Sequence, residues 1–251
     1  MRTIFFISTI VLIVGAITTA PLQAKEIDPE KEYAACMQLA RTQPEKGFEN
    51  ATLWRGLGGG DAASHCAAVS LLNMGHTVDA AERLESLAQT VKAAAAFKGA
   101  LLGQAGQAWL VAGNPEKAES LLTAAIKLSP EDLSLYVDRS QAFAARDAFG
   151  DAARDLDHVI AQAPDHVFAR VYRASAFRQL DKVQDAIRDV THALSIDPDH
   201  PEGLLESGIV RRLIGDEEGA RRDWLQVIEV AKDSDAAKSA QANLERLDGG
   251  G

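Results

Sequence analysis

The chain has 251 residues and a formal net charge of −10, because 36 Asp and Glu outnumber 26 Lys and Arg. A chain this acidic lacks the clustered cations that phosphate contacts need, which excludes a general nucleic-acid-binding role. The same balance argues against a strong electrostatic attraction to anionic lipid.

The first residues have the pattern of a targeting segment. Arg2 supplies a positive start, an apolar run extends from Ile4 to Ile17, and Ala24 ends a stretch of small and polar residues. This pattern predicts a secretory signal peptide at residues 1–24, cleaved after Ala24. The alternative is an uncleaved anchor, although the run is shorter than the roughly 20 residues that span a bilayer. We expect export to a bacterial periplasm without a stable membrane span, and a eukaryotic secretory lumen is the second option.

Two cysteines are present, Cys36 and Cys66. In an exported protein an even cysteine count favours a disulfide. The bridge would close a loop of about 30 residues and contribute about 3–4 kcal/mol. Free buried thiols and a metal site are the alternatives, and His65 beside Cys66 does not complete a zinc ligand set. We therefore expect a Cys36–Cys66 disulfide and no metal.

Residues 25–98 form the predicted N-terminal region. Helices are expected at residues 29–41 and 44–55, and the glycines at 58–60 then break the chain. No Gly-Lys-Ser/Thr sequence follows these glycines, which excludes a phosphate loop. Residues 61–90 are expected to form a degenerate helical hairpin, because Gly75 and Ala80 align with Gly113 and Ala118 at one common offset, slightly longer than the regular period of the later chain.

Prolines then recur at a fixed interval. Pro130, Pro164 and Pro198 are equally spaced, and the residues 12 and 21 positions before each proline are alanine and an aromatic residue. The 34-residue period that they define predicts a stacked array of helix-turn-helix units, in which each proline ends a second helix. Four units can be placed, at residues 99–132, 133–166, 167–200 and 201–234, and the fourth lacks its proline.

At these positions the chain resembles the tetratricopeptide-repeat (TPR) family, and specifically an exported bacterial member. The second unit carries the family's marks at Tyr136, Ser140, Phe143, Ala152, Leu156, Val159 and Pro164. The resemblance implies an all-α, right-handed superhelix of helix-turn-helix repeats. Residues 235–251 would then supply a capping helix at 236–247 and a disordered tail.

A charged pair recurs inside this frame. Arg139 and Arg173 stand one repeat period apart, and so do Asp155 and Asp189. We expect Arg139–Asp155 and Arg173–Asp189 ion pairs between the two helices of a repeat. The alternative is that these charges are separately solvated.

Catalytic patterns are lacking. No Gly-x-Ser-x-Gly elbow occurs, and the spacing of His158 with His192 and of His166 with His200 follows the repeat period. We therefore expect no enzyme activity, no catalytic residues, no cofactor and no metal.

The resemblance places a partner-binding groove on the first helix of each repeat. The predicted groove residues are Gln141, Phe168, Val171, Tyr172, Ser175, Arg178, Gln179, Leu205, Ile209 and Arg212. The Lys and Asn that family members use to grip a C-terminal carboxylate are absent, since Val137 and Val171 occupy the Lys position and Gln141 and Ser175 the Asn position.

The expected function is a non-catalytic scaffold of the cell envelope that binds a protein or peptide segment in this groove. The alternative is a structural protein that dimerises through its terminal helices. An apolar face on Trp224, Leu225 and Ile228 would favour that alternative.

Overall fold

The computed structural model describes residues 28–249, which form thirteen α-helices and no β-strand. The predicted signal peptide, residues 1–24, lies outside the described residues. The helix bounds are α1 Pro29–Thr42, α2 Pro44–Gly56, α3 Gly60–Asn73, α4 Thr77–Thr90, α5 Ala95–Val111, α6 Pro115–Leu128, α7 Leu133–Ala144, α8 Phe149–Gln162, α9 Val167–Gln179, α10 Val183–Ile196, α11 Pro201–Leu213, α12 Glu217–Val230 and α13 Asp235–Asp248.

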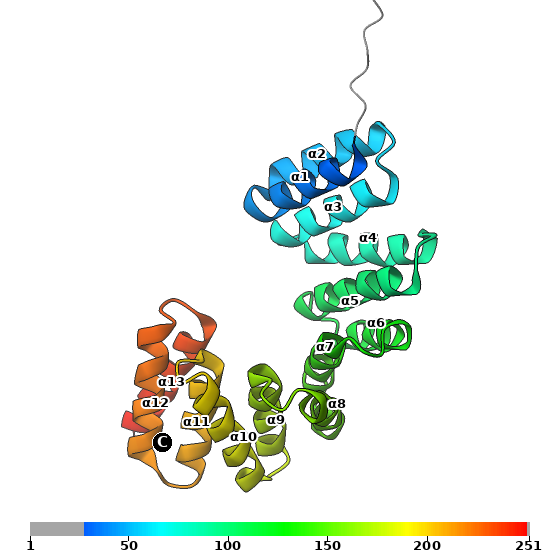
Figure 1. Ribbon diagram of the computed structural model, residues 1–251. Coiled ribbons are helices and arrows are strands. Elements are labelled where there is room, and N and C mark those ends of the chain that lie inside the picture. Colours follow the sequence, from blue (N-terminus) through cyan, green and yellow to red (C-terminus); the bar gives the residue numbers. More distant parts are fainter. Residues whose placement is uncertain (1–27, 250–251) are drawn as a thin grey trace, which may run out of the picture.

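These helices stack as hairpins along a curved array (Figure 1). From α5 onward, the first helices of the hairpins, α5, α7, α9 and α11, lie toward the inside of the bend, and α6, α8 and α10 lie outside. The all-α repeat architecture predicted from the 34-residue period is thus confirmed. One boundary differs, because α5 begins at Ala95 and the predicted division between residues 98 and 99 falls inside this helix.

From α3–α4 onward, the turn inside each hairpin contains one residue in the left-handed region. Positive φ angles occur at Gly75, Gly113, Asp147, Asp181 and Gly215, and the last four of these recur with the repeat period. Glycine adopts this conformation without steric cost, and aspartate tolerates it better than most residues. The same turn is therefore built five times, and Gly75 shows that the degenerate hairpin α3–α4 uses it too.

His166 and His200, which lie one repeat period apart, have the same structural role. His166 Nδ1 accepts a hydrogen bond from the backbone N–H of Ala169 at 3.2 Å, and His200 Nδ1 accepts one from Gly203 at 3.1 Å. Each histidine is thus the N-cap of an inner helix, α9 or α11. An acceptor side chain at this position satisfies one of the free N–H groups of the first turn. The spacing of these histidines reflects capping.

Small residues let the helices of a repeat approach closely. A Cβ atom on Gly106 of α5 would lie 2.6 Å from Leu122 Cγ of α6, which is too close for any side chain. In the later repeats the equivalent positions are Ser140 and Ala174, which are both buried, and Gly208, which faces the Trp224 indole. Close packing of this kind gives each hairpin a dense apolar core.

The predicted ion pairs are present. Arg139 donates to both carboxylate oxygens of Asp155, at 2.8 and 2.7 Å, and Arg173 does the same to Asp189 at 2.7 and 2.6 Å. These bidentate pairs are mostly buried, and they join the two helices of one repeat.

Each arginine also reaches the preceding repeat. Arg139 Nη1 donates to Thr123 Oγ1 at 3.1 Å, and Arg173 Nη1 donates to Asp157 Oδ1 at 2.7 Å. The two acceptors are themselves one repeat period apart. The arginine row therefore ties helices within repeats and between them.

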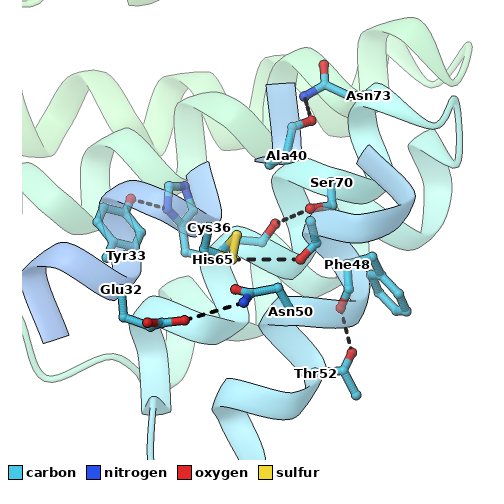
Figure 2. The surroundings of a disulfide bond; sticks show 12 residues. Glu32, Tyr33, Cys36, Ala40, Phe48, Asn50, Thr52, His65, Ser70 and Asn73 are labelled. Carbon is cyan, nitrogen blue, oxygen red and sulfur yellow. Dashed lines mark hydrogen bonds between the residues drawn. A yellow bond between two sulfur atoms is a disulfide. The ribbon is translucent and has the colours of Figure 1, made fainter. Parts of the chain in front are cut away.

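The N-terminal hairpins are tied differently. Cys36 of α1 and Cys66 of α3 form the expected disulfide, with their Cα atoms 6.1 Å apart. Both cysteines are buried in a cluster with Ala40, Ala51 and Trp54. Figure 2 shows the bridge and its surroundings. The disulfide joins the α1–α2 hairpin to the array at one point deep in its core.

Beside the bridge, a chain of polar side chains links α1, α3 and α5. Tyr33 of α1 donates its hydroxyl hydrogen to His65 Nδ1 at 2.7 Å (Figure 2), and His65 Nε2 donates to Gln104 Oε1 of α5 at 2.9 Å. Because the Gln104 amide oxygen can only accept, Nε2 carries the histidine proton and Nδ1 accepts from Tyr33. Burial lowers the pKa of His65, so the neutral form is favoured in the folded chain.

The C-terminal helix α13 covers the last apolar face, as expected. Its buried residues Ala236, Ala240 and Leu244 pack against Trp224 and Val227 of α12. Asp248, which was expected in a disordered tail, belongs to α13 and pairs with Arg221. Residues 250–251 lie outside the described part of the chain.

Candidate functional site

On the inner face of the array, residues at the same repeat position line up from one inner helix to the next. Gln104, Asp138, Tyr172 and Glu206 occupy equivalent places on α5, α7, α9 and α11, at 34-residue intervals. Neighbouring inner helices pack side by side, so members of a row lie next to one another. The row places an amide, a carboxylate, a phenol and a second carboxylate in that order from α5 to α11.

The structure brings most of the predicted groove residues to this face. Phe168 and Gln179 are exposed, and Phe168 retains 47% of its surface. The half-buried members are Gln141, Tyr172, Ser175, Arg178, Leu205, Ile209 and Arg212. Leu205 and Ile209 also pack against the C-terminal cluster, so they offer only part of their surface to a partner.

Val171 is the exception among the predicted residues. Its side chain is 3% exposed, and its Cγ2 lies 3.4 Å from the Cβ position of Gly203 on α11. The following repeat therefore covers Val171, which belongs to the core between α9 and α11 and offers no surface to a partner. Counting repeat positions indicates the direction of a side chain, but it does not show what the next helix covers.

Arg178 was predicted to line the groove, but its charge is paired. Its Nε donates to Glu206 Oε1 at 2.6 Å and its Nη2 to Glu206 Oε2 at 3.2 Å. The side chains of Arg178 and Glu206 are 19% and 7% exposed. A charge neutralised in this way stabilises the contact between α9 and α11, and its removal would leave Glu206 buried without a partner.

Three predicted residues line a small pocket. Gln141, Tyr172 and Ser175 surround a space of about 90 Å³ between α7, α8 and α9, together with Phe149 and Leu156. This volume suits a small apolar side chain rather than a drug-sized ligand. The pocket adds an indentation to the inner face where α7 and α9 meet.

Two aromatic rings lie together on the α9 part of the inner face. The ring centroids of Phe168 and Tyr172 lie 6.2 Å apart on α9, and His200 meets the Phe168 ring edge-on at 4.7 Å. Burial raises the pKa of Tyr172, and the carboxylates of Glu202 and Asp138 raise it further. Both carboxylates therefore act on the tyrosine from neighbouring helices.

Asp138 is a functional candidate that lies outside the ten predicted groove residues. Gln107 Nε2 of α5 donates to Asp138 Oδ2 at 2.6 Å. Burial raises the pKa of Asp138 to about 6, with a smaller upward effect of Asp132, while the Gln107 hydrogen bond acts in the opposite direction. A half-buried carboxylate held by an amide retains its negative charge at neutral pH at a cost. Its repeat position, equivalent to that of Tyr172, places Asp138 on the inner face by sequence alone.

The C-terminal helices do not expose the large apolar face that dimerisation through Trp224, Leu225 and Ile228 would need. Trp224 is buried under α13, Ile228 is partly buried, and Leu225 is the exposed member of the three. The groove between α12 and α13, about 600 Å³, is lined by Ile228 and by both alanines and polar residues of α13, among them Lys238, Gln241 and Glu245. A polar outer face is typical of a capping helix.

Within residues 28–249 no group of three or more His, Cys, Asp or Glu side chains is arranged to hold a metal ion. None of the helices in that same range is both long and apolar enough to cross a bilayer.

Comparisons with known proteins find neither a matching family model nor a matching curated protein. Solved structures do match. PilF of Pseudomonas aeruginosa superimposes with a TM-score of 0.64 at 15% identity, over 86% of this chain and 99% of its own. YrrB, described as a TPR protein with an unusual peptide-binding site, gives 0.53 at 14% identity, over 72% and 91% of the two chains.

The chain has the tetratricopeptide-repeat fold. MamA of Desulfovibrio magneticus RS-1 supports the same conclusion, with a TM-score of 0.57 at 20% identity over 73% of this chain and 97% of that one. At these identities the likeness establishes the TPR fold alone.

Proposed function

We propose that this TPR protein is a non-catalytic scaffold that binds a segment of another protein along the inner face of α5, α7, α9 and α11. One observation carries the proposal. The inner face exposes an aromatic residue, Phe168, while arginines that could repel or attract a partner over a distance are engaged inside the array. A curved face of apolar and amide side chains suits an extended or helical peptide segment.

The structural neighbours support the same class of function. YrrB is described as having a peptide-binding site, and it shares the TPR fold with this chain. We infer that this chain also uses its concave face for a peptide or protein ligand. The absence of the Lys and Asn of the carboxylate clamp at Val137, Val171, Gln141 and Ser175 argues for recognition of an internal segment rather than a chain end.

The proposed compartment is the cell envelope, specifically the periplasm. The signal-peptide pattern at residues 1–24 supports it, although that segment lies outside the described residues. The Cys36–Cys66 disulfide is a second support, because such bridges persist in oxidising compartments.

The test is affinity capture from the native envelope with two matched double variants. Phe168→Ala/Ile209→Ala removes apolar surface from the inner face, and Leu225→Ala/Val230→Ala removes exposed apolar surface from α12. We expect proteins that are recovered with the wild type and the α12 variant to be lost with the inner-face variant. Recovery of the same proteins with all three chains would overturn the proposal. An Arg178 variant is unsuitable, because it would also break the pair with Glu206.

Self-assembly through a terminal helix remains the second candidate, and one observation favours it. Leu53 and Leu57 lie one helical turn apart at the end of α2, and each is 71% exposed. A dimer through this end predicts that Leu53→Glu/Leu57→Glu lowers the mass measured by light scattering at high concentration. A wild-type chain that is already monomeric under these conditions would exclude the candidate.

A further inference from the structure

Four side chains of three neighbouring inner helices are juxtaposed on the concave face. Phe168 and Tyr172 stand one turn apart on α9. Asp138 occupies the Tyr172 position on α7, and Glu202 occupies the Phe168 position on α11, each exactly one repeat away in the sequence. An aromatic pair is therefore flanked by one carboxylate on each side. The influence of both carboxylates on Tyr172 is consistent with this proximity.

Neither carboxylate has a cation of its own. Among residues 28–249 the hydrogen-bond partner of Asp138 is the neutral amide of Gln107. Glu202 lies 3.6 Å from His200 Nδ1, but this nitrogen accepts the Gly203 N–H and so carries no proton. Both carboxylates therefore lack a compensating positive charge in the described part of the chain.

The arginines of α9 cannot supply that charge. Arg170 and Arg173 are both bound to Asp189 of α10, and Arg178 is bound to Glu206. Each of these arginines is less than one-fifth exposed, so all three are fixed by partners inside the array. The exposed aromatic surface and the two carboxylates are left facing the groove together.

Such an arrangement has a defined chemical complement. A cation is attracted to the face of an aromatic ring, most strongly where carboxylates lie nearby and water is partly excluded. The Phe168 ring packs against buried His200 in a T-shaped contact and keeps 47% of its surface exposed. An acidic ligand, by contrast, would meet uncompensated negative charge from both sides.

We propose that Phe168 and Tyr172, flanked by Asp138 and Glu202, receive a lysine or arginine side chain of the bound partner segment. This inference rests on the proposed function and adds to it the chemistry of the segment. The partner would carry a basic residue among apolar ones, and the basic residue would fix its register along the groove. Its charge is complementary to the acidic chain as a whole.

The experiment selects displayed random dodecapeptides against the full chain with its disulfide intact. We expect the recovered peptides to share one lysine or arginine flanked by apolar residues. A recovered lysine peptide and its norleucine counterpart are then titrated against the wild type, Asp138→Asn/Glu202→Gln and Glu49→Gln/Glu229→Gln. The last variant is the control: like the first double variant it removes two carboxylates, but from exposed positions on α2 and α12, away from the inner face.

The expected result is a coupled loss of affinity. Norleucine should weaken binding to the wild type about tenfold and binding to Asp138→Asn/Glu202→Gln by less than twofold, while Glu49→Gln/Glu229→Gln behaves as the wild type. An equal norleucine effect on all three chains would overturn the inference.

Two further outcomes separate this inference from the proposed function. Peptides without a basic residue that lose binding to Phe168→Ala/Ile209→Ala would overturn the inference and leave the groove function standing. If no recovered peptide is sensitive to that inner-face variant, both the inference and the proposed function fail.

Discussion

The N-terminal hairpins and the regular repeats of this chain are held together by different chemistry. In α1–α4 a covalent bridge, Cys36–Cys66, joins α1 to α3 inside an apolar cluster. In α7–α10 the tie is a row of buried arginine–aspartate pairs that recurs once per repeat and also contacts the preceding repeat. A covalent bridge acts at one place, whereas a periodic ion pair connects each repeat to the next.

The last repeat has an altered version of the arginine–aspartate pair. Asp223 stands one repeat period after Asp189, but Ser207 stands where arginine would be. Ser207 donates to Asp223 at 2.6 Å, and Arg211, one turn further along α11, lies 2.9 Å from the same carboxylate. The last repeat thus keeps the carboxylate and supplies its cation from another position.

The largest expected loss of stability comes from removing Asp189, the aspartate that pairs with two arginines. Asp189→Ala removes the shared partner of Arg170 and Arg173 and leaves two largely buried arginines close together without it. We expect the free energy of unfolding to fall by about 3–5 kcal/mol. Urea unfolding followed by circular dichroism measures the change, and a loss below about 1 kcal/mol would contradict a structural role for the pair.

Removal of the Cys36–Cys66 disulfide should destabilise the N-terminal hairpins. Cys36→Ser/Cys66→Ser opens a loop of 30 residues and is expected to destabilise the chain by about 3 kcal/mol. Because repeats contact only their neighbours, hydrogen exchange should accelerate in α1–α3 and stay unchanged in α9–α12. Equal acceleration in both regions would show that the bridge stabilises the array as a whole.

A smaller effect, with opposite sign, is expected for the unpaired carboxylate. The pKa of Asp138 is raised to about 6 from 3.8, so the folded state binds the proton more tightly than the unfolded state. This contribution to stability is present at low pH and is lost as pH rises from 3.8 through about 6. Asp138→Asn should therefore stabilise the chain by about 1–2 kcal/mol at pH 8 and have little effect near pH 3.5. Thermal unfolding at the two pH values is the measurement, and a destabilised variant at pH 8 would contradict it.

The smallest change in stability is expected for Asp185→Ala, which is the matched control for Asp189→Ala. Asp185 lies on the same helix α10 and pairs with Arg188 in an exposed contact. Exposed pairs contribute little, so Asp185→Ala should change the free energy of unfolding by about 0.5 kcal/mol or less in the same urea experiment. A cost comparable to that of Asp189→Ala would show that burial is not what distinguishes the two pairs.

The sequence predicted the periodic features well. The 34-residue spacing identified Arg139–Asp155 and Arg173–Asp189, because equivalent positions in stacked repeats have equivalent neighbours. It could not reveal that Arg211 replaces the missing arginine of the fourth repeat, since this contact breaks the period. Local signals also placed the capping helix to within one residue at each end.

The predicted groove residues differ in how accessible the structure leaves them. The resemblance to the TPR family placed Phe168, Tyr172 and Ile209 on the inner face, and in the structure Phe168 is exposed while the other two are half-buried. The same reasoning placed Val171 and Arg178 in the groove, where the structure covers the first and neutralises the second.

The sequence by itself therefore determined the helices, their turns, the repeat period and the pairing of the two cysteines. These features depend on local propensity, on fixed spacing and on the small number of available partners. Only the tertiary structure decided which charges of the inner face are paired. Glu206 meets Arg178, and Asp138 meets an amide, because side chains of adjacent helices approach one another only after the repeats have stacked.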